Sequence, residues 1–167
     1  EEKQSGTWEL LATKPLSKWA IILGKYMAGW MLVIVALLPV LLYYFIVSYL
    51  AEPVGNIDSG AFWGSFTGLI LLAAVYVAIG IFSSSLSNNQ LVSFVTAVVI
   101  SFFMLYGFEL IGSFFNSGKL IYILENCGIQ SHYKSISRGV IDSRDLIYFL
   151  IVIYIFLFFT EKKMTKN

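Results

Sequence analysis

The chain has 167 residues, of which 58% are hydrophobic and 17% aromatic, and its formal net charge is +1. Charged residues make up 13%, about half of the roughly 25% usual in soluble domains. A soluble core of this length could not bury so much apolar surface, so the composition indicates an integral membrane protein without a nucleic-acid partner. One cysteine and one histidine exclude an internal disulfide and a metal site built on several imidazoles.

Residues 1–25 form a polar, Trp-bearing lead-in to the apolar part of the chain. Gly6 and Pro15 break it, and Glu9 lies in the first turn of a short helix expected over 8–13. From Trp19 onward apolar residues recur at helical spacing, flanked by lysines, which is typical of an interfacial helix. We therefore expect a cytoplasmic segment over 1–25, and we interpret its start at Glu1 as a point inside a longer chain. The plainer alternative is a solvated lead-in to a span.

Four uncharged runs predict four membrane-spanning helices, because about 20 apolar residues cross the hydrocarbon core. The spans are predicted at about 26–51, 61–83, 91–111 and 144–160, within a transmembrane domain over 26–160. The last run is short, so residues 143–145 are needed to begin its helix. Between the third and fourth spans, 112–143 is too long for a turn and too apolar for a solvated loop, so it predicts an outer re-entrant segment of short helices.

Basic residues predict the orientation. The lead-in and the tail at 161–167 together carry seven of the eleven Lys and Arg residues, and the loop at 52–60 carries none. An even number of spans places both ends on one side, and the positive-inside rule assigns that side to the cytoplasm.

Small residues four apart in the second predicted span allow close helix packing in lipid. They are Gly64 and Gly68, followed by Ala74 and Ala78.

Candidates for chemistry are few. Glu109 ends the third uncharged run, where we expect it to reach the outer interface. His132 could be paired with Asp142 or Glu125, but the spacing supports neither pair, and we expect a surface histidine. No phosphate-binding loop is present, so ATP would not bind this chain by that route.

Three stretches resemble the type-2 ABC exporter permeases. Residues 2–17 read EKQSGTWELLATKPLS and precede Trp19 and the ILGK of 22–25. The second span and its exit, 64–94, contain Tyr76, AIG at 78–80, SSL at 84–86 and NQ at 89–90. The third stretch, 132–149, reads HYKSISRGVIDSRDLIYF. Within the family the likeness is greatest to the gliding-motility-associated permease subunits.

The resemblance implies an all-α polytopic bundle with six spans in the full chain and an amphipathic coupling helix before the four spans seen here. It implies no catalysis and no cofactor of its own, with ATP bound by a separate ABC ATPase subunit. It also implies a second permease copy or paralogue, export across a bacterial inner membrane, and cytoplasmic ends. Gly80 joins the small residues expected at helix contacts.

The resemblance assigns roles to two groups of residues. The ATPase contact would comprise Gly6, Thr7, Trp8, Glu9, Leu10, Leu11, Thr13, Pro15 and Leu16. The segment 112–143 would form an outer gate, with candidate residues Glu109, His132, Arg138 and Asp142. Two alternatives stay open. A membrane-embedded transferase would have to recruit Glu109, His132 and Asp142, whereas a membrane anchor of a larger machine would transport nothing.

Overall fold

The structure is a computed structural model that describes residues 17–115, 118–140 and 142–166. Its described part is all-helical, and four of the helical stretches are long and apolar enough to cross a membrane. They are Lys18–Leu50, Ser59–Leu86, Gln90–Gly112 and Ser143–Thr165. The predicted fold class, a transmembrane helical bundle with four spans in this chain, is therefore confirmed.

The first two long helices form an antiparallel pair, α2 (Lys18–Leu50) and α3 (Ser59–Leu86). Each begins at a side-chain cap, because an oxygen of Ser17 or Asp58 accepts a hydrogen bond from a backbone N–H three residues later. The helix α2 already includes 18–25, so the predicted interfacial segment continues directly into the first span.

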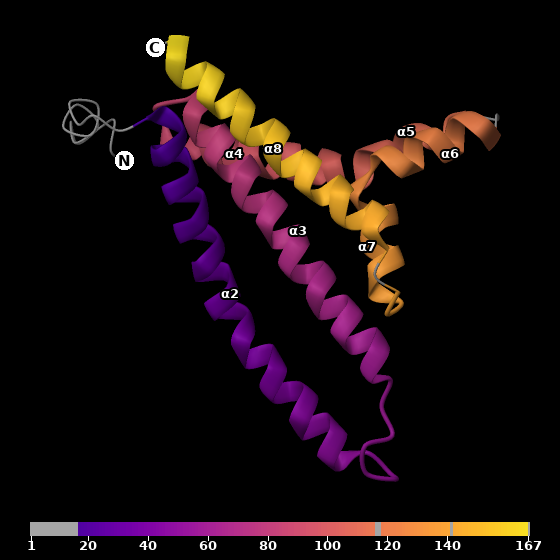
Figure 1. The fold of residues 1–167 in the computed structure, drawn as a ribbon. Helices are drawn as coiled ribbons and strands as arrows, with labels where there is room; N and C mark the ends of the chain where they lie inside the picture. Colours follow the sequence, from indigo (N-terminus) through magenta and orange to yellow (C-terminus); the bar gives the residue numbers. More distant parts are fainter. Residues whose placement is uncertain (1–16, 116–117, 141, 167) are drawn as a thin grey trace.

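The central helix is α3, which contacts α2, α4, α7 and α8. Figure 1 shows it running between α2 on one side and α7 and α8 on the other. Its buried residues include the predicted small pair Ala74 and Ala78 and their neighbours Val75 and Ile79. The core is completed by apolar side chains from three helices: Ile22, Tyr26, Ile129, Ile136, Phe149, Val152, Ile153 and Leu157.

The third span is interrupted. It consists of α4 (Gln90–Phe102), a π-helical turn η1 (Phe103–Gly107) and α5 (Phe108–Gly112). A π-helical turn inserts one extra residue into an otherwise α-helical ladder and rotates the face that the following turns present.

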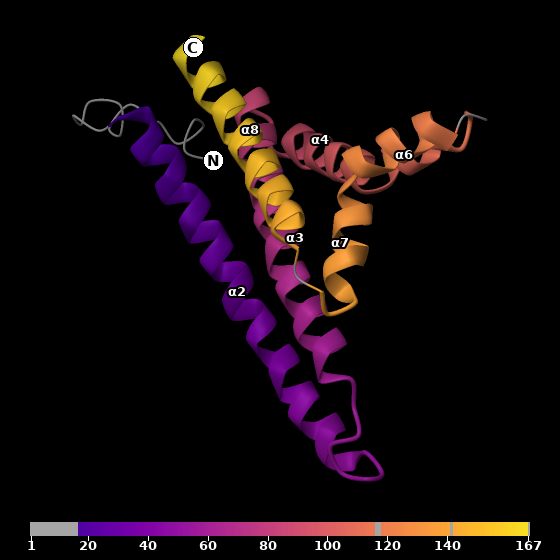
Figure 2. The same ribbon diagram turned by 45° about the vertical axis from the view of Figure 1, so that its right-hand side comes forward.

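The predicted re-entrant region contains two short helices, α6 (Gly118–Cys127) and α7 (Ile129–Ser137), and is followed by α8 (Ser143–Lys166). In Figure 2, α6 projects away from the bundle on the side opposite α2, and α7 turns back along α3. The chain then reverses at Gly139, whose positive φ of 83° suits a residue without a Cβ.

Candidate functional site

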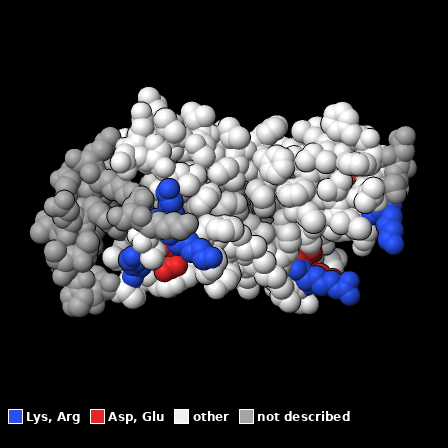
Figure 3. Space-filling view, turned by 90° about the horizontal axis from the view of Figure 1, so that it is seen from above, with Lys and Arg blue, Asp and Glu red and all other residues white. Residues whose placement is uncertain are grey.

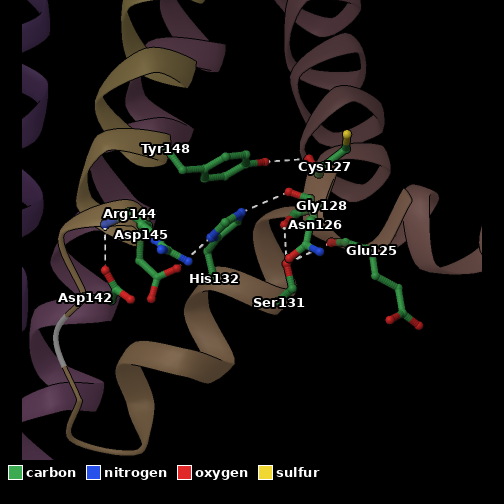
Figure 4. A network of polar contacts seen from close by, with 10 residues as sticks. All are labelled: Glu125, Asn126, Cys127, Gly128, Ser131, His132, Asp142, Arg144, Asp145 and Tyr148. Atoms are coloured by element: carbon green, nitrogen blue, oxygen red, sulfur yellow. Dashed lines mark hydrogen bonds and ion pairs between the residues drawn. The ribbon is translucent and has the colours of Figure 1, made fainter. Parts of the chain in front are cut away.

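The most developed polar site lies where α6, α7 and α8 meet (Figure 4). His132 of α7 stands between the two other helices. Its Nε2 lies 2.9 Å from the carbonyl oxygen of Asn126, and its Nδ1 lies 2.7 Å from Oδ1 of Asp145. Both ring nitrogens are therefore engaged, one by the end of α6 and the other by the first turn of α8.

Tyr148 closes the site from above the imidazole. Its ring is stacked on that of His132, with centroids 3.9 Å apart and planes 19° from parallel. Its hydroxyl donates a hydrogen bond of 2.6 Å to the carbonyl oxygen of Cys127. Asp145 and Tyr148 are three residues apart on α8 and so share one face of the helix, which is why both reach His132.

The site is largely shielded from solvent. The side chain of His132 is 15% exposed and that of Asp145 is 9% exposed. The second carboxylate oxygen of Asp145, Oδ2, is buried and has no hydrogen-bond partner among the described residues. The expectation of a surface histidine is therefore wrong: the ring is enclosed by three helices.

Local sequence explains how Asp145 comes to face the histidine. Asp142 caps α8, since its Oδ1 accepts a 2.9 Å hydrogen bond from the backbone N–H of Arg144. Asp145 then falls in the first turn of the helix, where the dipole favours a negative charge. The partner of His132 is thus Asp145, and neither Asp142 nor Glu125 makes the pair that the sequence left open.

Glycines of α3 determine where α7 lies. A Cβ built on Gly64 would be closest to the carbonyl oxygen of Ile136 and would lie 2.7 Å from Cα of Gly139. A Cβ on Gly68 would lie 3.2 Å from the ring of Tyr133. These two predicted packing glycines therefore face the short helix α7 and the turn after it.

The other outer-gate candidates lie around this site. Glu109 of α5 forms a 3.6 Å ion pair with Lys134 of α7, and both side chains are about half exposed. Arg138 ends α7, and its backbone N–H donates to the carbonyl oxygen of Ser135. The structure thus brings His132 to Asp145 and Glu109 to Lys134, and it leaves Asp142 as a helix cap.

A second polar feature lies at the opposite end of α3. It is an open cavity of about 430 Å³ between the first turns of α2, the end of α3, the start of α4 and the end of α8. Hydroxyl and amide side chains of the α3–α4 turn line it together with Lys25. Gly80, predicted as a packing residue, also lines this cavity, and a Cβ there would meet nothing within 4 Å.

The predicted ATPase contact lies outside the described residues. It comprises Gly6, Thr7, Trp8, Glu9, Leu10, Leu11, Thr13, Pro15 and Leu16. Within the described ranges no group of three or more His, Cys, Asp or Glu side chains could hold a metal ion.

Sequence reasoning missed the roles of Asp145 and Tyr148. A signal was present, because an acidic residue directly before a strongly apolar span is costly to bury and calls for a partner. The histidine thirteen residues earlier is the partner that the turn at Gly139 brings within reach.

Four helices long and apolar enough to cross a membrane, with a polar, partly buried segment between the third and the fourth, indicate a multi-pass membrane protein. Residues 1–160 match the family described as ABC-2 family transporter protein, and the chain belongs to that family. It is therefore a membrane permease component of the ABC transporter class. No curated protein and no solved structure matches the chain.

Proposed function

We propose that this permease is the membrane subunit of an ATP-driven exporter, powered by a separate ABC ATPase subunit and paired with a second permease copy or paralogue. The observation that carries the proposal is the family match over 160 of the 167 residues. ATP binds the partner subunit in this scheme, and the permease converts ATPase closure into movement of its spans. Gliding motility is the process we propose for it, on the strength of the sequence resemblance.

The sequence resemblance supports a bacterial inner-membrane location, and the basic residues near the two ends of the chain support cytoplasmic ends. Lys18 at the start of α2 donates a 3.4 Å hydrogen bond to the carbonyl oxygen of Met164 near the end of α8, so the two helix ends meet. In Figure 3, which views the molecule from this end, one group of basic side chains, with an acidic side chain among them, lies toward the left, and further basic side chains lie toward the opposite side of a mostly uncharged surface. The loop between α2 and α3, at the other end, has no Lys or Arg.

The geometry of the outer site favours transport over the alternative of a membrane-embedded transferase. A general base needs a ring nitrogen that can reach a substrate proton. Both nitrogens of His132 are occupied within the protein, and Asp142 caps a helix. Among the candidates for catalysis, His132 and Glu109 therefore join helices and Asp142 caps one.

We also propose, from the sequence resemblance, that residues 6–17 before α2 form a helix that docks in a groove of the ATPase. The test is made in this segment. Full-length permease carrying both Glu9→Arg and Leu10→Arg is coexpressed with its ATPase, and the ATPase that copurifies is measured. A helix seated in a groove through apolar anchors should lose most of the recovered ATPase when an anchor becomes charged.

The matched control makes two polar substitutions in the loop at the other end, Val54→Gln and Asn56→Gln, where both side chains are exposed and no basic residue is added to a loop that has none. The control should retain the ATPase. Equal recovery from the docking variant and the control would refute the role of residues 6–17, and loss in both would point to a folding defect. A purified permease that leaves ATP hydrolysis by its partner unchanged would favour the anchor over the transporter.

A further inference from the structure

The hydrogen bonds of His132 constrain how many protons its site holds. The group facing Nε2 is the carbonyl oxygen of Asn126, which can only accept a hydrogen bond, so Nε2 must carry a proton. The group facing Nδ1 is Oδ1 of Asp145, at 2.7 Å. A neutral imidazole has one N–H, and that N–H is already used at Nε2.

A second proton is therefore needed between Nδ1 and Oδ1. It resides either on the imidazole, which then donates to a carboxylate, or on the carboxyl group, which then donates to a neutral ring. Without it, two lone pairs face one another at 2.7 Å. Moving the only N–H to Nδ1 transfers the same conflict to Nε2 and the Asn126 carbonyl, at 2.9 Å.

We propose that the pair of His132 and Asp145 is a proton-binding site, and that the bound proton holds the outer segment of α6 and α7 against α8. The ligand is a single proton shared between an imidazole and a carboxyl group. Its binding satisfies both ring nitrogens and Oδ1, whether the proton resides on the imidazole or on the carboxyl group.

Burial makes this proton consequential. The side chains of His132 and Asp145 are 15% and 9% exposed, and water has limited access to the contact between Nδ1 and Oδ1, whereas the contact of Nε2 with the Asn126 carbonyl is exposed. The buried Oδ2 of Asp145 has no partner in the described part of the chain, which disfavours a bare carboxylate beside a neutral ring. The stacked ring of Tyr148 lies on the imidazole face and stabilises it when it is charged.

Other ionisable groups on the elements around the pair are few. The helix α7 carries Lys134, which is paired with Glu109 of α5, and Arg138 follows it as the C-cap. The neighbours on α8 and its cap are Arg144, Asp142 and Tyr148, and those on α6 are Lys119, Tyr122, Glu125 and Cys127. Tyr133 lies on α7 and Tyr106 on η1, and α8 carries Tyr154, Glu161, Lys162 and Lys163 farther along its length. The helix α3, which packs on α7, carries Tyr76 and no charged residue. In Figure 4 the carboxylate of Glu125 points away from the imidazole.

The sign of the pH dependence follows from proton linkage. The closed arrangement holds one proton more than an opened one in which His132 is neutral and Asp145 ionised. Low pH therefore favours closure and rising pH favours release. One linked proton changes the ratio of released to closed molecules by at most about tenfold per pH unit.

Cys127 provides a probe, because it is exposed and its carbonyl contacts Tyr148. Full-length permease in lipid nanodiscs, with any cysteine other than Cys127 replaced by serine, is labelled there once with a nitroxide. Its electron paramagnetic resonance spectrum is then recorded from about pH 5 to about pH 9, the range in which histidine can titrate. The mobile component should grow as pH rises, by up to about tenfold per unit relative to the immobile one.

Asp145→Asn is the decisive variant. An amide can donate to Nδ1 of a neutral His132 while Nε2 still donates to the Asn126 carbonyl, so every contact is satisfied without the extra proton. The label should stay immobile across the whole range. The matched control is Asp142→Asn, a neighbouring carboxylate that only caps α8, and it should titrate like the unmodified protein.

Three results would overturn the proposal: a spectrum of the unmodified protein that does not change with pH, an Asp145→Asn protein that titrates normally, or one that is mobile at every pH although it is folded. A second measurement needs no Asp145 variant. Nitrogen NMR of isotope-labelled histidine, assigned with His132→Gln, should show a proton on Nε2 wherever the label is immobile. A neutral ring protonated at Nδ1 under those conditions contradicts the site.

Discussion

The contact between Gly64 of α3 and the end of α7 predicts a sharp penalty for one added methyl group. In Gly64→Ala the new Cβ would press on the carbonyl oxygen of Ile136 and lie 2.7 Å from Cα and 2.8 Å from N of Gly139, whereas ordinary contacts begin at 3.4 Å. All three neighbours are backbone atoms, so no change of rotamer relieves the overlap. The two helices must separate.

The magnitude follows from two opposing effects. Overpacking costs about 1–3 kcal/mol, and a contact made only with backbone belongs at the upper end. Replacing a helical glycine by alanine returns about 1 kcal/mol. We therefore expect a net loss of about 2 kcal/mol, which corresponds to a melting temperature lower by about 4–8 °C for a chain of this size.

The assay is thermal unfolding of purified full-length permease in detergent, followed by the loss of the monodisperse peak in size-exclusion chromatography. Gly80→Ala is the matched control, because it lies in the same helix with nothing within 4 Å of the added Cβ. It should be neutral or slightly stabilising. Equal melting temperatures for the two variants would refute the close approach of α7 to α3.

Two further substitutions test the turn and the site. Gly139→Ala should destabilise the protein more than Gly55→Ala. Both glycines have a φ of 83°, so both variants carry about 1–2 kcal/mol of left-handed strain. Of the two, only Gly139 also packs against the backbone of α3, so its variant carries an additional overlap. Equal melting temperatures would contradict the packing. Tyr148→Phe keeps the ring stacked on His132 and removes the hydroxyl, so melting should report a loss of about 1 kcal/mol, and an unchanged value would argue against the hydrogen bond to α6.

The long helices could be predicted because each is encoded locally. Uncharged runs and their polar borders decide where a span lies, and the caps at Asp58 and Asn89 coincide with the predicted loops. The first residue of a helix was harder to predict from the sequence. The helix α2 begins at Lys18, within the segment assigned to the interface. Nothing in the sequence separates an amphipathic first turn from the helix that continues it.

The polar site could not be predicted, because it depends on a contact between segments. His132 and Asp145 are joined only after the chain reverses at Gly139, and that reversal is fixed by glycines some seventy residues earlier in α3. From the sequence, Gly64 and Gly68 indicated close packing without indicating the partner. The spacing of four identifies a flat helix face, but it does not distinguish a long span from a short helix such as α7.

The helices α2 and α8 differ in apolar length, and this has a consequence for the bilayer. At 1.5 Å per residue, the uncharged run of α2 is about 38 Å long and that of α8 about 22 Å, so one is longer and the other shorter than the roughly 30 Å of hydrocarbon. A thinner membrane therefore suits α8 and obliges α2 to tilt further, whereas a thicker one does the reverse. Because the two helices touch near the cytoplasmic ends proposed for them, a change of lipid chain length is expected to change the angle between them.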